Sequence, residues 1–463
     1  MSTDDRKMSV DEFLRLERQA IEALARDLGR EVVDKLDRVL VRDILYERKS
    51  TEPPARHKVL ITLRSERRDA ASLIRPTSLD RARCVRDMQR GTERTMQGLV
   101  EDLERRGAQV RERFWITPTV AAEAPTEALV AIAARGDVAH VATIRIQWTT
   151  RSGESGTGSA LTTRIPGYDG TGVRVGILDT GVAKDHPALD GRVELQQDFT
   201  GDGIGDQHGH GSQSAGLVAS RDDTYPGIAP GATLVDLKMI DYYGSSDPQM
   251  ALAGLQGAVA AGVDVACCAW GFSHLAMHWS DPPAVGAPDG ACVLCSAVDN
   301  AVAAGVVVVA AAGNDGSDPA STYDTHVNCP GLAAGAITVG ASKGHEAMFS
   351  ISSVGPTPGG RSKPDLVAPG VGIVTCRPPG TGLGRPLNAD FTVVDGTSSA
   401  TAYVVGVVAL MLQKNPQLTS GQVKRILMDF AIDLGAATVE MGAGCVDAVA
   451  ALQATPLPQR GVT

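Results

Sequence analysis

Hydrophobic and polar residues follow different periods in different parts of this chain. Over residues 9–48, apolar residues recur every three or four positions between charged ones, which is the period of an amphipathic helix. Glu52-Pro53-Pro54 ends this pattern, because proline does not continue a helix. The sequence therefore predicts a helical N-terminal extension over residues 1–56.

The next segment, residues 57–147, alternates between strand-like and helix-like patterns. His57–Leu63 is strand-like, and a charged helical stretch follows it. Two further strands, a helix and a last strand ending near Ile146 complete the order β-α-β-β-α-β. This order is typical of a small ferredoxin-like α+β domain built on a split βαβ unit. A Gly- and Ser-rich composition follows, so residues 148–166 are expected to form a linker.

Apolar runs without clean alternation dominate the rest of the chain. Strands that are buried on both faces have this character, and helical patterns lie between them. The sequence therefore predicts an α/β domain over residues 167–454, a parallel sheet flanked by helices, with residues 455–463 as a C-terminal tail. The expected strands are Val173–Leu178, Thr233–Ile240, Val263–Cys268, Val306–Ala312 and Ala336–Val339, and the expected helices are Pro248–Ala261, Ala297–Ala304, Ser398–Lys414 and Ser420–Ala431.

Composition and charge narrow the classes of partner. The chain has 463 residues, of which 43% are hydrophobic and 21% charged, as in globular proteins. Its formal net charge of -10 argues against a nucleic-acid or anionic-membrane partner. No apolar run reaches transmembrane length, and the start has no apolar core of a secretory signal. We therefore expect a cytoplasmic protein.

The positions of the cysteines give a weaker indication of metal binding or redox chemistry. Cys267 and Cys268 are adjacent in an apolar run, which suits buried reduced thiols better than a disulfide framework. Cys292-Val293-Leu294-Cys295 has the spacing of a zinc or redox half-site, but the sequence offers no second C-x-x-C and no histidine pair at ligand spacing. A zinc or redox protein therefore remains a minor alternative, and no metal site is expected.

Three short motifs contain the residue types of a nucleophilic hydrolase. Asp179 ends the strand-like run from Val175, His210 opens His210-Gly211-Ser212, and Ser398 lies in Gly396-Thr397-Ser398-Ser399-Ala400. A serine hydroxyl is a poor nucleophile, so it needs a base, and the base must be held in one tautomer by an acid. Asp179 ends a predicted strand, while the other two precede predicted helices, so all three can meet at one sheet edge. Singly, each is equally well explained by turn and cap preferences.

In the order Asp, His, Ser, these motifs resemble the subtilisin-like serine proteases over about residues 167–452. The resemblance implies a serine endopeptidase acting on polypeptides, with Ser398 as nucleophile, His210 as base and Asp179 as the group that orients it. It also implies that Asn314 donates to the oxyanion. Because His210–Gly216 aligns with the family's His-Gly-Thr-His-Val-Ala-Gly, His210 is preferred over His208. Further matching segments are His186-Pro187, Ala310–Asn314, Lys363–Gly370 and Gly442–Ala448.

The same resemblance points to the substrate-binding residues. Ala269-Trp270-Gly271 stands in place of the family's Ser-Leu-Gly, and its backbone would pair with an extended peptide. Ala312 and Gly313 complete the expected substrate-binding set, while the Trp270 side chain is equally well read as a subsite wall or as core. Ser399–Tyr403 departs from the family's Met-Ala-x-Pro-His, which puts rate and specificity in doubt. A pseudoprotease that binds a peptide without cutting it is the alternative function.

Cofactors and regulation follow from the resemblance as well. Ala188 stands where secreted relatives carry an aspartate ligand for calcium, and Asp198, Asp202 and Asp206 are read as Asx turns, so calcium is not favoured and no cofactor is expected. Residues 57–147 resemble the inhibitory propeptide of secreted subtilisins, notably at Trp115–Val120 and Asp137–Val141. This implies an intramolecular inhibitor, with processing near Trp148–Ser155. Residues 1–56 lie outside both resemblances and are read as a partner-binding arm or as additional packing.

Overall fold

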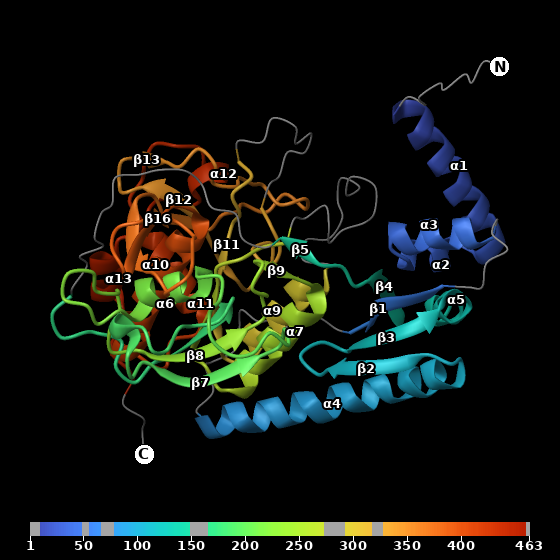
Figure 1. Ribbon diagram of the computed structural model, residues 1–463, viewed down its shortest axis with the longest axis horizontal. Helices are drawn as coiled ribbons and strands as arrows, with labels where there is room; N and C mark the ends of the chain where they lie inside the picture. Colours follow the sequence, from blue (N-terminus) through green and yellow to red (C-terminus); the bar gives the residue numbers. More distant parts are fainter. Residues whose placement is uncertain are drawn as a thin grey trace. The chain divides into compact units, whose positions relative to one another are not determined.

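The computed structural model describes residues 10–48, 55–65, 78–148, 165–272, 292–316 and 327–459. The contacts between residues divide the chain into two compact units. The small unit comprises residues 1–66 and 91–144, and the large unit comprises residues 67–90 and 145–463. Figure 1 draws both units, coloured along the sequence.

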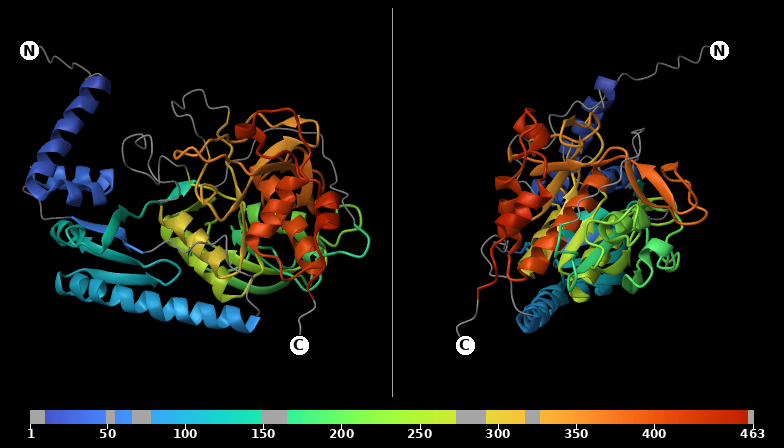
Figure 2. Two further views of the ribbon diagram at one scale, coloured as in Figure 1. Left: turned by 180° about the vertical axis from the view of Figure 1, so that it is seen from behind. Right: turned by 90° about the vertical axis from the view of Figure 1, so that its left-hand side faces the viewer.

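An antiparallel four-stranded sheet forms the centre of the small unit, with strand order β2-β3-β1-β4. Leu99 and Leu103 of α4 are buried in the same apolar core as Val59 and Ile61 of β1, so this part of α4 covers the sheet (Figure 2). The ferredoxin-like order predicted from the sequence is confirmed. The elements are β1 (Arg56–Leu63), α4 (Ser78–Arg105), β2 (Gln109–Phe114), β3 (Thr119–Pro125), α5 (Thr126–Ala133) and β4 (Val138–Thr143).

The N-terminal periodic stretch forms three helices, α1 (Val10–Leu28), α2 (Arg30–Lys35) and α3 (Arg38–Glu47). Gly29 separates the first two with a φ of 93°, a conformation that side chains disfavour. Asp37 begins α3, because one carboxylate oxygen accepts a hydrogen bond from the Leu40 amide at 2.7 Å.

These helices share the core of the small unit. Leu24, Leu40 and Ile44 are buried in the same cluster as the strands of the sheet. The second carboxylate oxygen of Asp37 accepts from the backbone amide and hydroxyl of Thr143, at 2.5 and 2.7 Å. The N-terminal helices are therefore anchored to the end of β4 by a buried acid as well as by apolar packing.

A sheet with parallel central strands forms the large unit, with strand order β13-β12-β11-β10-β6-β8-β7, and with β14 pairing to β12. Every pairing is parallel except that of the short β13 with β12. The central strands are buried along most of their length, which explains why their sequences lack alternation. The strands are β6 (Arg174–Asp179), β7 (Val193–Asp198), β8 (Thr233–Lys238), β10 (Val265–Cys268), β11 (Val307–Ala311), β12 (Ile337–Lys343), β13 (Ala347–Met348) and β14 (Leu366–Pro369).

Helices cover both faces of this sheet, so the predicted α/β architecture is confirmed. α6 (His210–Ala219) and α10 (Thr397–Lys414) share one apolar cluster with alternate residues of the strands. α7 (Pro248–Ala260) and α9 (Val293–Ala303) also contact the strands, but their residues do not belong to that cluster. These two helices therefore lie on the opposite face of the sheet. Three further helices are α11 (Ser420–Asp429), α12 (Thr438–Met441) and α13 (Ala448–Ala454).

Several elements were not predicted, and most of them have only two to four residues, too few to display a period. No helix in the part of the chain that the structure describes combines the length and apolar character needed to cross a membrane. The unpredicted elements are β5 (Gln147–Trp148), η1 (Pro187–Leu189), β9 (Ser245–Ser246), β15 (Ile373–Cys376), β16 (Arg385–Pro386) and β17 (Phe391–Val394), together with β7, β13 and α12.

A carboxyl group is buried within the sheet at Asp236 in β8. Its Oδ2 atom accepts from the Val182 amide at 3.0 Å and from the Gln196 side chain at 2.9 Å. Its Oδ1 atom is buried and has no hydrogen-bond partner among the described residues. Burial raises the pKa of Asp236 to about 7, so the carboxyl group is largely protonated in the folded protein below neutral pH.

We expect this group to make the folded state less stable as pH rises. Between its ordinary pKa and about 7, the folded state binds the proton that the unfolded state releases, which removes about 3–4 kcal/mol of stability. Asp236→Asn should flatten this slope. Urea denaturation of both proteins between pH 5 and 8 measures the difference, with Asp190→Asn, an exposed site, as control. Parallel stability curves for wild type and Asp236→Asn would contradict the expectation.

Candidate active site

Three elements of the large unit bring the predicted catalytic residues to one end of the sheet. Asp179 is the last residue of the central strand β6, His210 is the first residue of α6, and Ser398 lies in the first turn of α10. α6 and α10 pack against each other. The side chains therefore come from elements that the sequence predicted, at the carboxyl edge where parallel sheets bind ligands.

Asp179 and His210 form a buried hydrogen-bonded pair. The Nδ1 atom of His210 lies 2.7 Å from Oδ1 and 2.9 Å from Oδ2 of Asp179. The Thr180 amide donates to Oδ1 at 2.8 Å, and the Ser214 hydroxyl donates to Oδ2 at 3.3 Å. With Nδ1 donating to a fixed carboxylate, Nε2 is left as the basic nitrogen of the imidazole.

The pKa of His210 is raised above its ordinary value. Burial by itself lowers this pKa, but the charge of Asp179, its hydrogen bond to the imidazole and the charge of Asp206 outweigh burial. The neutral form of the imidazole, which is the form that accepts a proton, therefore predominates only at a pH above that of an ordinary histidine.

This shift predicts the acid limb of the pH profile. If His210 is the catalytic base, activity needs its neutral form, and kcat/KM should fall as pH falls through a midpoint above about 6.5. Asp179→Asn removes the charge that raises the pKa, so its residual activity should show a midpoint at lower pH. Peptide hydrolysis between pH 5 and 9 measures the acid limb of the wild type and that of Asp179→Asn, with Asp190→Asn as control. An acid midpoint that is unchanged in Asp179→Asn would show that another group titrates.

His208, the competing candidate for the base, has a different environment. Its ring centroid lies 6.5 Å from that of His210, and its Nδ1 atom is buried with no hydrogen-bond partner within the described ranges. Burial first, and then the charge of His210, lower the pKa of His208. The Asp179 carboxylate thus pairs with His210 and not with His208.

Asp206 holds the loop that precedes α6, and its bonds to the amides of His208 and Gly209 form the Asx turn expected from the sequence. Its Oδ1 atom accepts from the Thr180 hydroxyl at 2.9 Å and the Gly209 amide at 2.7 Å. Its Oδ2 atom accepts from the Ser212 amide at 2.9 Å. Asp206 therefore caps α6 and ties it to the end of β6, which fixes His210 relative to Asp179.

The two other acids of the Gly-rich stretch also accept backbone hydrogen bonds. Asp198 accepts from the amides of Thr200 and Gly203, both at 2.8 Å. Asp202 accepts from the Tyr242 amide at 2.9 Å. Asp198 thus satisfies a turn of its own loop, whereas Asp202 joins its loop to the segment after β8.

The Ser398 side chain meets the expected substrate-binding segment. Its hydroxyl donates to the backbone oxygen of Ala269, immediately after β10, at 2.8 Å. Ser398 is half-buried, whereas Thr397 and Ser399 on either side are buried. The first turn of α10 therefore presents Ser398, and not its neighbours, to the surface at this site.

Asn314 is oriented by the residue that precedes Ser398. The amide and the hydroxyl of Thr397 both donate to Oδ1 of Asn314, at 3.0 and 2.9 Å. If the side-chain amide of Asn314 were rotated by 180°, its NH₂ group would face the two donors of Thr397. The two hydrogen bonds therefore fix Nδ2 on the side of Asn314 that faces away from Thr397. Gly396 has a φ of 143°, and a side chain there would begin 3.3 Å from Nδ2. The glycine thus keeps the space beside this donor open.

Trp270 resolves one alternative left open by the sequence. Its side chain is 1% exposed and contacts Phe272 edge to face, with ring centroids 5.6 Å apart. The indole therefore belongs to the core, and any contact of this segment with a peptide is through its backbone.

Asn328 lies between two expected substrate-binding glycines. A Cβ atom at Gly271 would be 2.8 Å from Cβ of Asn328, and one at Gly313 would be 2.5 Å from its Nδ2. The Asn328 amide donates to the Ala312 oxygen at 2.8 Å, and its side chain donates to Asp315 at 2.9 Å. No local motif marks Asn328, because its importance depends on glycines distant in sequence.

Comparisons with known proteins identify the family of the large unit. Residues 170–446 match the model of the subtilase family. The chain is 34% identical over 291 residues to subtilisin DY of Bacillus licheniformis, covering 62% of this chain and 93% of that protein. It is 33% identical over 284 residues to serine protease AprX of Bacillus subtilis, covering 56% of this chain and 61% of that protein.

The family match spans more than half of the chain, so the chain belongs to the subtilase family. It is a serine-type endopeptidase, and its substrates are polypeptides.

Proposed function

We propose that Ser398, His210 and Asp179 are the catalytic triad of this endopeptidase and that Asn314 is its oxyanion donor. The observation that carries the proposal is the hydrogen bond between Asp179 and Nδ1 of His210, which leaves Nε2 as the base. The link from Asn314 to Thr397, directly before Ser398, supports the fourth role.

In this mechanism Ser398 Oγ attacks the peptide carbonyl while Nε2 of His210 takes its proton. Asp179 stabilises the imidazolium, and the Asn314 NH₂ group stabilises the negative oxygen of the tetrahedral intermediate. His210 then protonates the leaving amine, and an acyl-enzyme remains. Water, deprotonated by His210, cleaves the acyl-enzyme and restores Ser398. Before attack the hydroxyl must turn away from the Ala269 oxygen.

A fluorophosphonate, which modifies only an activated serine, separates this function from peptide binding without cleavage. The chain lacking residues 1–148 should be labelled at Ser398, and His210→Ala should abolish the labelling. His208→Ala, outside the Asp179 pair, should retain it. A folded chain without any labelling at Ser398 would support the pseudoprotease instead.

We further propose that residues 57–147 act as an intramolecular inhibitor that is removed by processing. The supporting observation lies directly after the small unit, where β5 pairs antiparallel with β9 of the large unit through Gln147 with Ser246 and Trp148 with Ser245. A strand added in this way satisfies its backbone as an extended peptide does. The expected cleavage region, Trp148–Ser155, lies almost entirely outside the described residues.

N-terminal sequencing tests whether the enzyme cuts itself. Purified wild type should yield a new N-terminus within residues 148–166, and Ser398→Ala should remain full-length because the nucleophile is absent. Added active wild type should then cut the Ser398→Ala chain at the same bond. Identical cleavage of both proteins before that addition would assign the cut to another protease.

A further inference from the structure

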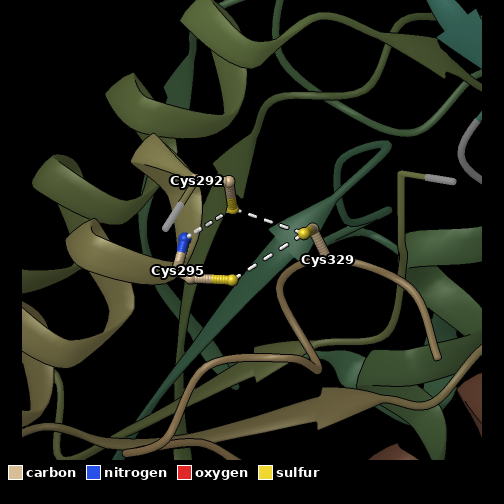
Figure 3. A group of neighbouring side chains, drawn as sticks. All are labelled: Cys292, Cys295 and Cys329. Carbon is tan, nitrogen blue, oxygen red and sulfur yellow. Dashed lines mark hydrogen bonds between the residues drawn. The ribbon is translucent and has the colours of Figure 1, made fainter. Parts of the chain in front are cut away.

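Three cysteine side chains from distant segments meet inside the large unit. Cys292 is the N-cap of α9, Cys295 lies in the first turn of that helix, and Cys329 comes from the segment before β12. The Sγ atom of Cys329 lies 3.3 Å from that of Cys292 and 3.7 Å from that of Cys295. Figure 3 shows the three thiols pointing toward one another.

The spacing of the three sulfur atoms is close to that of a metal-thiolate site. All three lie within 4.8 Å of one another. A tetrahedral zinc ion with Zn–S bonds of about 2.3 Å requires sulfurs about 3.8 Å apart. A disulfide needs a bond of about 2.05 Å and joins only two sulfurs. Convergence of three sulfurs is therefore better suited to one cation than to a bond between two of them.

The environment of the three thiols sets what a cation would have to displace. All three side chains are buried. Hydrogen bonding among the sulfurs, together with burial, raises the pKa of the Cys295 and Cys329 thiols. A cation that binds to thiolates would have to displace the thiol protons.

Helix α9 supplies electrostatic compensation for such a displacement. The Cys295 amide donates to the Cys292 sulfur at 3.2 Å, so a backbone N–H of the first turn already points at the cluster. The N-terminus of a helix favours negative charge. Three thiolates around a divalent cation carry one net negative charge, which this position of the fold accommodates.

We propose that Cys292, Cys295 and Cys329 bind one zinc ion as three thiolates. Three thiols lose three protons and gain three Zn–S bonds, with no change in oxidation state. The Cys292-x-x-Cys295 pair was the half-site visible in the sequence, and the fold adds Cys329 as the third ligand.

The ion would fix a segment that borders the substrate-binding residues. The Cys329 amide donates to the Phe272 oxygen at 3.1 Å, and the Phe272 amide donates back at 2.7 Å. The residue before Cys329, Asn328, is bound to Ala312. Zinc at this cluster would therefore tie α9 to Asn328 and Cys329, which contact Ala312 and Phe272. We expect the ion to stabilise the large unit.

Zinc titration of the full-length Ser398→Ala chain, reduced and freed of metal, tests the proposal. Competition with a chromophoric chelator should show one ion per chain and release of about three protons. Zinc should protect three of the eight cysteines from alkylation, as counted by mass, and should raise Tm. Cys329→Ser should weaken binding at least 100-fold. Cys376→Ser, a buried cysteine of β15 outside the cluster, should bind as before.

Three outcomes would overturn the proposal. They are the absence of stoichiometric binding by fully reduced protein, equal binding after Cys329→Ser, and a Cys292–Cys329 disulfide in the protein as isolated. If circular dichroism shows that Cys329→Ser does not fold, the proposal is decided by which cysteines zinc protects from alkylation in the chain with all three cysteines present. Protection of cysteines other than Cys292, Cys295 and Cys329 would then assign the ion elsewhere.

Discussion

Replacing Ser398 by alanine is expected to lower kcat for peptide hydrolysis about 10⁶-fold, the size of the loss measured for the nucleophile of subtilisin itself. The reason is that the proposed nucleophile is then absent, while the Asp179–His210 pair remains in place. Hydrolysis of a chromogenic peptide by the chain freed of residues 1–148 measures the effect. His208→Ala should lose far less, because His208 makes no hydrogen bond to Asp179 among the described contacts.

The double variant Ser398→Ala/His210→Ala provides a sharper criterion. Residues that act as one unit lose their effect together, so adding His210→Ala to Ser398→Ala should change kcat very little. A large additional loss would mean that His210 acts independently of Ser398. Activity of Ser398→Ala within tenfold of wild type would exclude Ser398 as the nucleophile.

Replacing Asp365 by alanine should destabilise the large unit by about 3–5 kcal/mol, because it leaves a buried lysine without its counter-charge. The buried Asp365 carboxylate accepts from Lys363 at 2.7 Å through Oδ2 and from Lys424 at 2.7 Å through Oδ1. Lys363 is 1% exposed, and burial lowers its pKa to about 7 even beside this carboxylate. Asp365 also holds β12, because its Oδ2 atom accepts from the Thr338 amide at 2.8 Å.

Urea denaturation of the Ser398→Ala chain, in which self-digestion is absent, measures this loss. Asp429→Ala, an exposed acid at the end of α11, should change stability by less than about 0.5 kcal/mol. Replacing Lys363 by methionine together with Asp365→Leu should recover part of the loss, since the pair is then removed as a whole. A loss below about 1 kcal/mol for Asp365→Ala would show that water reaches Lys363.

The sequence identified those candidate site residues that lie in local motifs. Asp179 ends an apolar run, and His210 and Ser398 lie in the first turns of helices, in three short motifs that are visible in the sequence. The structure brings these elements to one edge of the sheet. α9, by contrast, begins at Val293 and not at Ala297, because the Cys292 side chain caps it. A sulfur cap is not a preferred helix start, so the pattern alone placed the boundary too late.

The residues that the sequence did not reveal act across the fold. Asp206 was expected only to form a turn, but it also ties the helix that carries His210 to the end of β6, and Asn328 fills the space between Gly271 and Gly313. Cys329 completes a cluster with a half-site more than thirty residues earlier in the chain. None of these positions has a distinctive neighbour in sequence, so a pattern read over a short window contains no signal for them.

The sequence by itself determined the main helices and strands, the parallel sheet of the large unit with helices on both faces, and three motifs that have the residue types of a hydrolase. Those properties depend on period, on turn and cap preferences and on short motifs, all of which are local. Only the tertiary structure decided that the N-terminal helices share the core of the small unit, which way the Asn314 amide faces and that three cysteines converge. These depend on contacts between residues far apart in the chain, whose geometry is set by packing of the whole domain.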